Sequence, residues 1–303
     1  MYKAISVEMA FLLSPVMAIF LLSIVLVLVI GLGVAYLWVR QMTRRIYRRP
    51  TDYPNPANQI QGKITVVCAG DSITHGNVSY NWVNALRANL ASDYHVFNAG
   101  INSDLSYTLL GRIDEILAVK PDVVIVMIGT NDVNAKLSKQ ALKRYYQQKK
   151  IAEGTLPTLA SYQANVTAIV KRIKNETTAR VAVMSLPVMG EDLSHQANLT
   201  ADTYSAWLKK LADEQDCAYL PVRERMKAFL MANPQPLRYT FAQTTRLIYQ
   251  CIWGHYVQGK TWDELAQING FQLVTDNLHL NSAAGDLIVE LVAGFVKDKT
   301  TKS

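Results

Sequence analysis

A serine that follows an apolar run is the first residue of this chain whose type and place suggest chemistry. Ser72 lies in Gly70-Asp71-Ser72-Ile73, directly after the apolar residues 64–69. A serine hydroxyl is a weak nucleophile until a neighbouring base removes its proton. A turn at the carboxyl end of a strand would hold this serine rigidly and expose it. Taken alone, the tripeptide is more often a plain turn, and Thr74 stands where the Gly-x-Ser-x-Gly elbow of α/β-hydrolases has its second glycine.

A histidine near the end of the chain can supply the base. His279 closes the segment Asp276-Asn277-Leu278-His279, just before the last helical pattern. Histidine is the best general base near neutral pH, and a carboxylate three residues earlier can accept from its Nδ1 and leave Nε2 facing a serine. Read alone, Asp276 and His279 would more often cap a helix. The sequence contains no metal-ligand motif, P-loop or dinucleotide fingerprint, so we expect no metal and no organic cofactor.

Two further segments can stabilise negative charge on a reacting carbonyl. Gly100, in Asn98-Ala99-Gly100, can offer its backbone N–H at close approach. Asn131, in Gly129-Thr130-Asn131-Asp132, has an amide that donates without titrating. One donor in an oxyanion hole is worth roughly 3–4 kcal/mol in the transition state. Each segment alone also fits an ordinary turn glycine or an Asx turn.

Short apolar runs that alternate with helical stretches must position these residues. Strands are predicted at 64–69, 95–98, 123–128, 181–186 and 218–222, and helices at 80–90, 109–119, 159–173, 203–211 and around 287–295. This alternation implies βαβ units in an α/β fold, a three-layer α/β/α sandwich with a mainly parallel central sheet. Ligands bind beyond the carboxyl ends of such strands, where three of the four segments lie.

The four segments, in this order and at these places, resemble the SGNH (GDSL) hydrolase superfamily from about Lys63 to Val296. The resemblance implies the flavodoxin-like fold of that superfamily and hydrolysis of carboxylic (acyl) esters. It implies a nucleophile, a base and an orienting carboxylate, which are Ser72, His279 and Asp276. It also implies an oxyanion hole from Ser72 N–H, Gly100 N–H and the Asn131 side chain, with Asp71 and Asp132 supporting the loops.

The chain departs from the superfamily pattern in the loop after Gly100. Ser103 stands where the superfamily often has a second glycine, and Leu105 where it has a threonine. Neither position belongs to the implied catalytic set, but both put the shape of this loop in question. Ile73 replaces a commoner leucine, which is conservative. His75 is too close to Ser72 to be the base, and we interpret it as a loop or substrate-side residue.

The amino-terminal segment predicts one membrane-spanning helix. Residues 10–39 contain no charged side chain and exceed the roughly 20 residues that cross a bilayer core. Ser14 and Pro15 have the types of an N-cap and a first helical residue. A cleaved signal peptide would have an apolar core of about 7–15 residues, and Gly33-Val34-Ala35 is only a weak cleavage-like triplet. We therefore predict an uncleaved, single-pass anchor.

The distribution of charge predicts on which side of the membrane the following domain lies. Five arginines lie directly after the apolar segment: Arg40, Arg44, Arg45, Arg48 and Arg49. The positive-inside rule puts them, and the domain behind them, in the cytoplasm. We interpret them as a stop-transfer signal rather than a specific lipid site. From Pro50 onward 25 Lys and Arg face 23 Asp and Glu, so no nucleic-acid partner is expected. The three cysteines match neither a zinc site nor a disulfide framework.

The predicted organisation is an anchor with basic flank at 1–50, a linker at 51–62 and a hydrolase domain at 63–303 with a helical, aromatic-rich insertion at 234–270. The insertion is equally consistent with a lid over the site and with a packed helical insertion. Anchor and insertion together favour a lipid-like acyl ester or thioester substrate. The alternatives are a carbohydrate O-acetyl esterase and, from another class, a catalytically silent membrane-tethered binding protein.

Overall fold

A computed structural model describes residues 15–45, 48–52 and 62–298, which belong to two compact units, Met1–Met42 and Thr43–Ser303. The first unit consists of helix α1 (Pro15–Met42). By length and composition α1 can cross a membrane, and none of its apolar window is buried. A signal sequence near the amino terminus meets the same criterion. The predicted apolar helix is therefore present, while the predicted N-cap at Ser14 lies outside the described residues.

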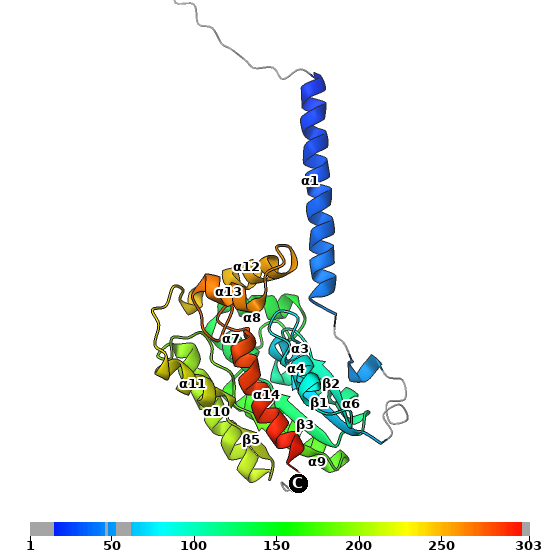
Figure 1. Ribbon diagram of the computed structural model, residues 1–303, viewed down its shortest axis with the longest axis vertical. Coiled ribbons are helices and arrows are strands. Elements are labelled where there is room, and N and C mark those ends of the chain that lie inside the picture. The colour runs from blue at the N-terminus through cyan, green and yellow to red at the C-terminus, as the bar shows by residue number, and fades with distance from the viewer. Residues whose placement is uncertain (1–14, 46–47, 53–61, 299–303) are drawn as a thin grey trace, which may run out of the picture. The chain divides into compact units, whose positions relative to one another are not determined.

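The second unit alternates strands and helices (Figure 1). Its strands are β1 (Ile64–Gly70), β2 (Tyr94–Gly100), β3 (Val123–Met127), β4 (Arg180–Met184) and β5 (Ala218–Leu220). Its helices are η1 (Pro50–Asp52), α3 (Ser72–His75), α4 (Trp82–Asn89), α5 (Ser106–Gly111), α6 (Ile113–Leu117), α7 (Thr130–Leu137), α8 (Lys139–Gln147), α9 (Leu159–Glu176), α10 (Gln196–Glu214), α11 (Val222–Ala232), η2 (Phe241–Gln243), α12 (Thr244–Tyr256), α13 (Trp262–Asn269) and α14 (Ser282–Lys297).

The five strands form one parallel sheet in the order β2-β1-β3-β4-β5. This confirms the predicted α/β fold. β1 pairs with both β2 and β3, and its last residue, Gly70, lies opposite Gly100 of β2 and Met127 of β3. The chain segments that follow these three strands therefore start side by side at the carboxyl ends of the strands. These are the segments that begin with Asp71, Ile101 and Ile128.

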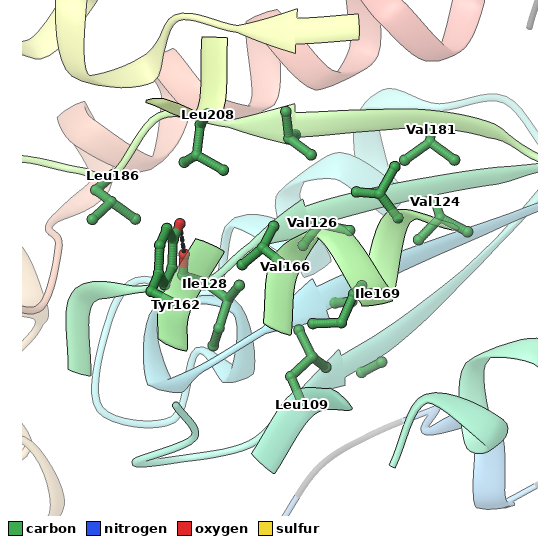
Figure 2. Close-up of a cluster of buried hydrophobic side chains, with 14 of the residues drawn as sticks. Leu109, Val124, Val126, Ile128, Tyr162, Val166, Ile169, Val181, Leu186 and Leu208 are labelled. Carbon is green, nitrogen blue, oxygen red and sulfur yellow. Dashed lines mark hydrogen bonds between the residues drawn. The ribbon is translucent and has the colours of Figure 1, made fainter. Parts of the chain in front are cut away.

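Helices cover both faces of the sheet because successive strand residues point to opposite sides. One face, with Val67 and Val126, packs against α5, α6, α9 and α10 (Figure 2). The other face, with Cys68 and Ile125, packs against α4, α11 and α14. The strands are buried on both sides, which explains why their sequences are apolar runs rather than alternating patterns.

A buried tyrosine fixes the end of β3. The hydroxyl of Tyr162 on α9 donates to the carbonyl of Ile128 at 2.9 Å, the dashed bond in Figure 2. Its ring packs against Gly129, where an added Cβ would lie 2.7 Å from a ring carbon. Gly129 also has φ +133°, a conformation that favours glycine. The chain therefore leaves β3 in one direction and enters α7 with Asn131 in its first turn.

The insertion at 234–270 is packed into the domain. Leu247 and Cys251 of α12 are fully buried, and α13 begins at a capping box, where Thr261 Oγ1 accepts from Glu264 N–H. Gly270 ends α13 with φ +73°, a left-handed conformation that glycine adopts readily. The insertion thus contributes to the core, although part of α12 faces solvent.

Candidate active site

Ser72, His279 and Asp276 form a hydrogen-bonded series. His279 Nε2 lies 3.0 Å from Ser72 Oγ, and His279 Nδ1 lies 2.8 Å from Asp276 Oδ2. Ser72 is the first residue of α3, directly after β1, and the other two residues lie in the loop before α14. All three side chains are buried. The structure therefore brings Ser72 to Asp276 and His279, which lie more than two hundred positions later in the sequence.

The Asp276 carboxylate is held by its own loop. Its Oδ1 accepts from the backbone N–H groups of Leu278 (3.0 Å) and His279 (2.9 Å), which turns Oδ2 toward the imidazole. With a carboxylate acceptor at Nδ1, that nitrogen carries the proton. Nε2 is then unprotonated and can accept the hydroxyl proton of Ser72, as a general base must.

The insertion supports this loop from behind. Asn277 Nδ2 donates to the Thr240 carbonyl and to Thr244 Oγ1, both at 3.2 Å. Asn269 Nδ2 on α13 donates to the Thr275 carbonyl at 2.8 Å. Residues of 234–270 therefore position the loop that carries His279, a role that the sequence did not reveal. The residue type at position 277 is the local sign of this loop's conformation, because the φ of +77° there is tolerated best by glycine and asparagine.

Asp71 holds the turn from β1 into α3. Its Oδ1 accepts from the Ile73 N–H at 3.0 Å and so caps the helix that begins with Ser72. Burial raises the pKa of Asp71 to about 7. The Ser72 N–H, the first of the helix, has no acceptor within the described ranges, so it is available to a ligand.

Asn131 has a fixed orientation. Its Nδ2 donates to the Asp104 carbonyl at 2.9 Å, and its Oδ1 accepts from the Tyr145 hydroxyl at 2.6 Å. Burial raises the pKa of Tyr145, which therefore stays a neutral donor. An amide nitrogen carries two protons, so one Asn131 N–H remains for a ligand. The sequence did not identify Tyr145, because it reaches Asn131 from the next helix, α8.

Carboxylates hold the loop between β2 and α5. Asp132 accepts from Ser106 Oγ (2.6 Å) and from Ser106 N–H (3.0 Å), and burial raises the pKa of Asp132 to about 6. Asp104 pairs with Arg112 Nε at 2.7 Å and with Lys150 Nζ at 2.6 Å. These contacts tie the loop to α5, α7 and the segment after α8. They also fix the Asp104 carbonyl that holds Asn131.

The backbone N–H groups of Gly100 and Ser103, in the loop after β2, differ in their hydrogen bonds. The Gly100 N–H donates to Asn98 Oδ1 at 2.9 Å, so an oxyanion would have to compete for it. A Cβ on Gly100 would lie 2.2 Å from the His75 nitrogen, so glycine is needed here for close packing. Ser103 takes φ +64°, which explains why glycine is common at its position. Within the described ranges its N–H has no acceptor, and it adjoins Asp104, which binds Asn131.

His75 is a buried residue of α3. Its Nε2 lies 3.2 Å from the Arg45 carbonyl, and burial lowers its pKa from 6.5 to about 4. The imidazole is therefore neutral at physiological pH, and it holds the Arg45 backbone against α3. No cluster of three His, Cys, Asp or Glu that suits a metal occurs in the described part of the chain.

His75 gives the fold a pH dependence that can be measured. The native state holds a neutral imidazole down to about pH 4, whereas the unfolded chain protonates near pH 6.5. Stability from this group is complete above pH 6.5 and is lost as pH falls toward 4, at up to about 1.4 kcal/mol per pH unit. The difference in unfolding free energy between the wild type and His75→Gln should therefore be constant above pH 6.5 and shrink below it. Denaturant titrations of the detergent-solubilised chain measure this, and a constant difference down to pH 4 would show that the imidazole is solvated.

Comparison with known proteins connects this geometry to one family. Residues 68–284 match the model of the GDSL-like Lipase/Acylhydrolase family. A search of curated proteins found no match. Among solved structures, the acetyl xylan esterase AlAXEase is 20% identical with a TM-score of 0.54, covering 77% of this chain and 100% of its own.

Two more solved structures have the same fold. Axe2, an acetylxylan esterase from Geobacillus stearothermophilus, is 18% identical with a TM-score of 0.52 and covers 79% of this chain and 97% of its own. The lipase/acylhydrolase from Enterococcus faecalis is 20% identical with a TM-score of 0.50 and covers 77% of this chain and 95% of its own.

Proposed function

Because this chain belongs to the GDSL-like lipase/acylhydrolase family and is an ester-cleaving hydrolase, we propose that Ser72 is its nucleophile, His279 its base and Asp276 the carboxylate that orients the base. The observation that carries this proposal is the unbroken hydrogen-bonded series from Ser72 Oγ through His279 to Asp276, with both bonds between 2.8 and 3.0 Å. Distances in this range permit proton transfer without rearrangement.

The reaction is acyl transfer to water. Ser72 Oγ attacks the ester carbonyl carbon while His279 Nε2 takes the hydroxyl proton. The tetrahedral intermediate collapses, and the alcohol leaves with the proton from His279. A water molecule, deprotonated by the same nitrogen, then attacks the acyl-enzyme and releases the acid. Asp276 stabilises the imidazolium that forms in both steps.

Three donors stabilise the oxyanion. Ser72 N–H and the second proton of Asn131 Nδ2 have no internal acceptor within the described ranges. The third donor was expected to be Gly100 N–H. We assign it instead to Ser103 N–H, because Gly100 N–H already donates to Asn98 Oδ1 and Ser103 adjoins the residue that holds Asn131. Preorganised donors of this kind act on charge that develops only in the transition state.

The favoured substrate is a lipid-like acyl ester or thioester. An apolar helix long enough to cross a bilayer precedes the domain, and α12 exposes large apolar side chains to solvent. The second candidate is an O-acetylated carbohydrate, because two of the structural neighbours are acetyl xylan esterases. At their low identity this likeness extends to the fold, so acyl-chain preference must decide.

Acyl-chain length separates the two substrates. Each methylene buried in an apolar site contributes about 0.8 kcal/mol, so kcat/KM should rise about fourfold per methylene from acetyl to longer nitrophenyl esters until the acyl site is filled. The full chain in detergent micelles, with Ser72→Ala subtracted as background, provides the measurement. A preference for the acetyl ester would contradict the lipid-like substrate and support the carbohydrate one.

We also propose a single-pass membrane protein with its hydrolase domain in the cytoplasm. The support is α1 and the five arginines that directly follow its apolar part. A reporter fused after residue 303 should be active on the cytoplasmic side. Activity confined to the opposite side would contradict this orientation without affecting the proposed chemistry.

A further inference from the structure

Helix α12 exposes a stripe of large apolar side chains. Tyr249, Trp253 and Val257 are 62%, 46% and 41% exposed. They are spaced four residues apart, which places them on one face of the helix. Single exposed apolar residues are common, but an aromatic stripe on one helix marks a surface that contacts something else. We name these three residues the α12 stripe.

The stripe is not needed to hold the helix in the fold. The opposite face of α12 is anchored by Leu247, Ile248 and Cys251, which are buried in the domain core. The end of α12 is fixed by His255, whose ring stacks on Trp262 of α13 with centroids 4.1 Å apart. α12 therefore carries apolar side chains on two faces, of which the domain covers one.

The chain around the stripe is free of acidic residues. From 225 to 262 the sequence contains no Asp or Glu and five Lys or Arg. Arg246, one turn before Tyr249, is exposed. Arg225 and Lys227 of α11 pair with Glu290 and Asp202, so Arg246 is the positive charge of this set that lies on α12 itself. Apolar and aromatic side chains beside an exposed arginine suit the interface of a bilayer that contains anionic lipids.

The same side of the domain holds the first residues after α1. Asn102 Nδ2 donates to the Thr43 carbonyl at 2.8 Å, and the Arg45 carbonyl accepts from Asn77 Nδ2. The Asn77 carbonyl in turn accepts from the Tyr256 hydroxyl at 2.5 Å, at the end of α12. A single residue thus connects α12 to the segment 43–45. Figure 1 shows α12 and α13 at the same end of the second unit as α3, which carries Ser72.

We propose that the α12 stripe docks on the surface of a bilayer containing anionic lipids. Thr43 follows the apolar helix directly in the chain, so in an anchored protein the residues tied to Asn77 emerge at the membrane surface. Tyr and Trp rings prefer the headgroup region, and Arg44, Arg45 and Arg246 supply charge complementary to anionic headgroups. Docking in this way would orient the edge of the sheet that carries Ser72 toward lipid. The inference rests on the proposed anchoring, and it is independent of the proposed catalytic residues.

Site-specific fluorescence in vesicles tests the docking. The full chain, with Cys217→Ala to remove a half-buried thiol, receives an environment-sensitive fluorophore at Tyr249→Cys. Leu28→Cys in α1 is the control for membrane insertion. Lys210→Cys is the control for water exposure, because the Lys210 side chain is exposed and lies near the end of α10, which leads to the amino end of β5, whereas Ser72 follows the carboxyl end of β1. Each labelled chain is placed at low density in vesicles of phosphatidylcholine and phosphatidylglycerol, with and without nitroxide-labelled lipid.

If the α12 stripe docks, nitroxide lipid should quench the fluorophore at position 249, and its emission should shift to the blue in vesicles. Both effects should be smaller at 249 than at 28 and absent at 210. The shift at 249 should weaken in pure phosphatidylcholine and at high salt. Trp253→Ser with Val257→Ser should reduce quenching at 249, whereas Leu199→Ser, an exposed apolar residue of α10, should not. A probe at 249 that stays in water while 28 is quenched would overturn the docking and leave the anchor intact. Absence of quenching at both 249 and 28 would overturn the docking and the membrane anchor. A blue shift at 249 that occurs only at high protein density would overturn the docking and indicate that a second copy of the chain covers the α12 stripe.

Discussion

Replacing Ser72 by alanine should abolish ester hydrolysis and leave the fold unchanged. The Ser72 hydroxyl contacts His279 Nε2 and is not used to hold α3, whose cap is Asp71. In a serine triad, loss of the nucleophile lowers kcat on the order of 10⁶-fold. Because the triad acts as a unit, Ser72→Ala combined with His279→Ala should be no slower than either change alone.

The measurement is turnover of a short nitrophenyl ester by the full chain in detergent, with thermal unfolding as the test of structure. Ser92→Ala is a matched control, because Ser92 is an exposed serine whose hydroxyl contacts only its neighbour Asp93. A fluorophosphonate should label the wild type at Ser72 and fail to label Ser72→Ala. Full activity in Ser72→Ala would contradict the assignment. A wild type that resists the label would instead suggest a membrane-tethered binding protein with this fold.

The strands β1 and β3 could be predicted closely because they are buried on both faces. The run at 123–128 exceeds β3 by one residue, and the run at 64–69 stops one residue short of β1. Ser72 and Asn131 were recognisable since each directly follows such a run. Their local structure was not foreseen: both lie in the first turn of a helix, α3 and α7, rather than in a loop.

Interactions between distant elements explain what the sequence did not reveal. The helix predicted at 109–119 is two helices, α5 and α6, which meet at Arg112. The Arg112 guanidinium donates to the carbonyls of Ala99 (2.7 Å) and Gly70 (3.2 Å), so its backbone departs from the helix to reach the ends of β2 and β1. Periodicity reports the apolar face of a helix and cannot report a polar contact with another element.

The hydrogen bonds from Gly100 to Asn98 and from Tyr145 to Asn131 were also not predicted, because polar contacts of this kind leave no periodic pattern in the sequence. Asn98 was predicted only as the last residue of a strand, but its side chain accepts from Gly100 N–H and donates to the Thr74 carbonyl. Tyr145 lies fourteen residues after Asn131 in a segment rich in lysine and glutamine, where nothing distinguishes it from the neighbouring Tyr146. The structure separates the two tyrosines by their contacts, and that difference can be tested.

Replacing Asn131 by alanine should lower kcat by about 10²–10³-fold with little change in KM, because its free N–H acts on charge that develops in the transition state. Tyr145→Phe should produce a smaller loss in kcat. Without the hydroxyl at 2.6 Å, the Asn131 amide can rotate and present its oxygen, rather than its nitrogen, to the oxyanion. Tyr145 is thus a positioning residue that acts through Asn131.

A double-mutant cycle distinguishes this role from a general effect on stability. If Tyr145 acts through Asn131, Tyr145→Phe should change kcat little in the Asn131→Ala background. Tyr146→Phe is the matched control, since this tyrosine lies on the same helix and its hydroxyl donates to Thr155 at 2.7 Å without touching Asn131. Steady-state kinetics on one nitrophenyl ester give kcat and KM for all variants. Equal losses from Tyr145→Phe and Tyr146→Phe, or additive losses in the cycle, would contradict the positioning role, because only a shared path through the Asn131 amide makes the two changes overlap.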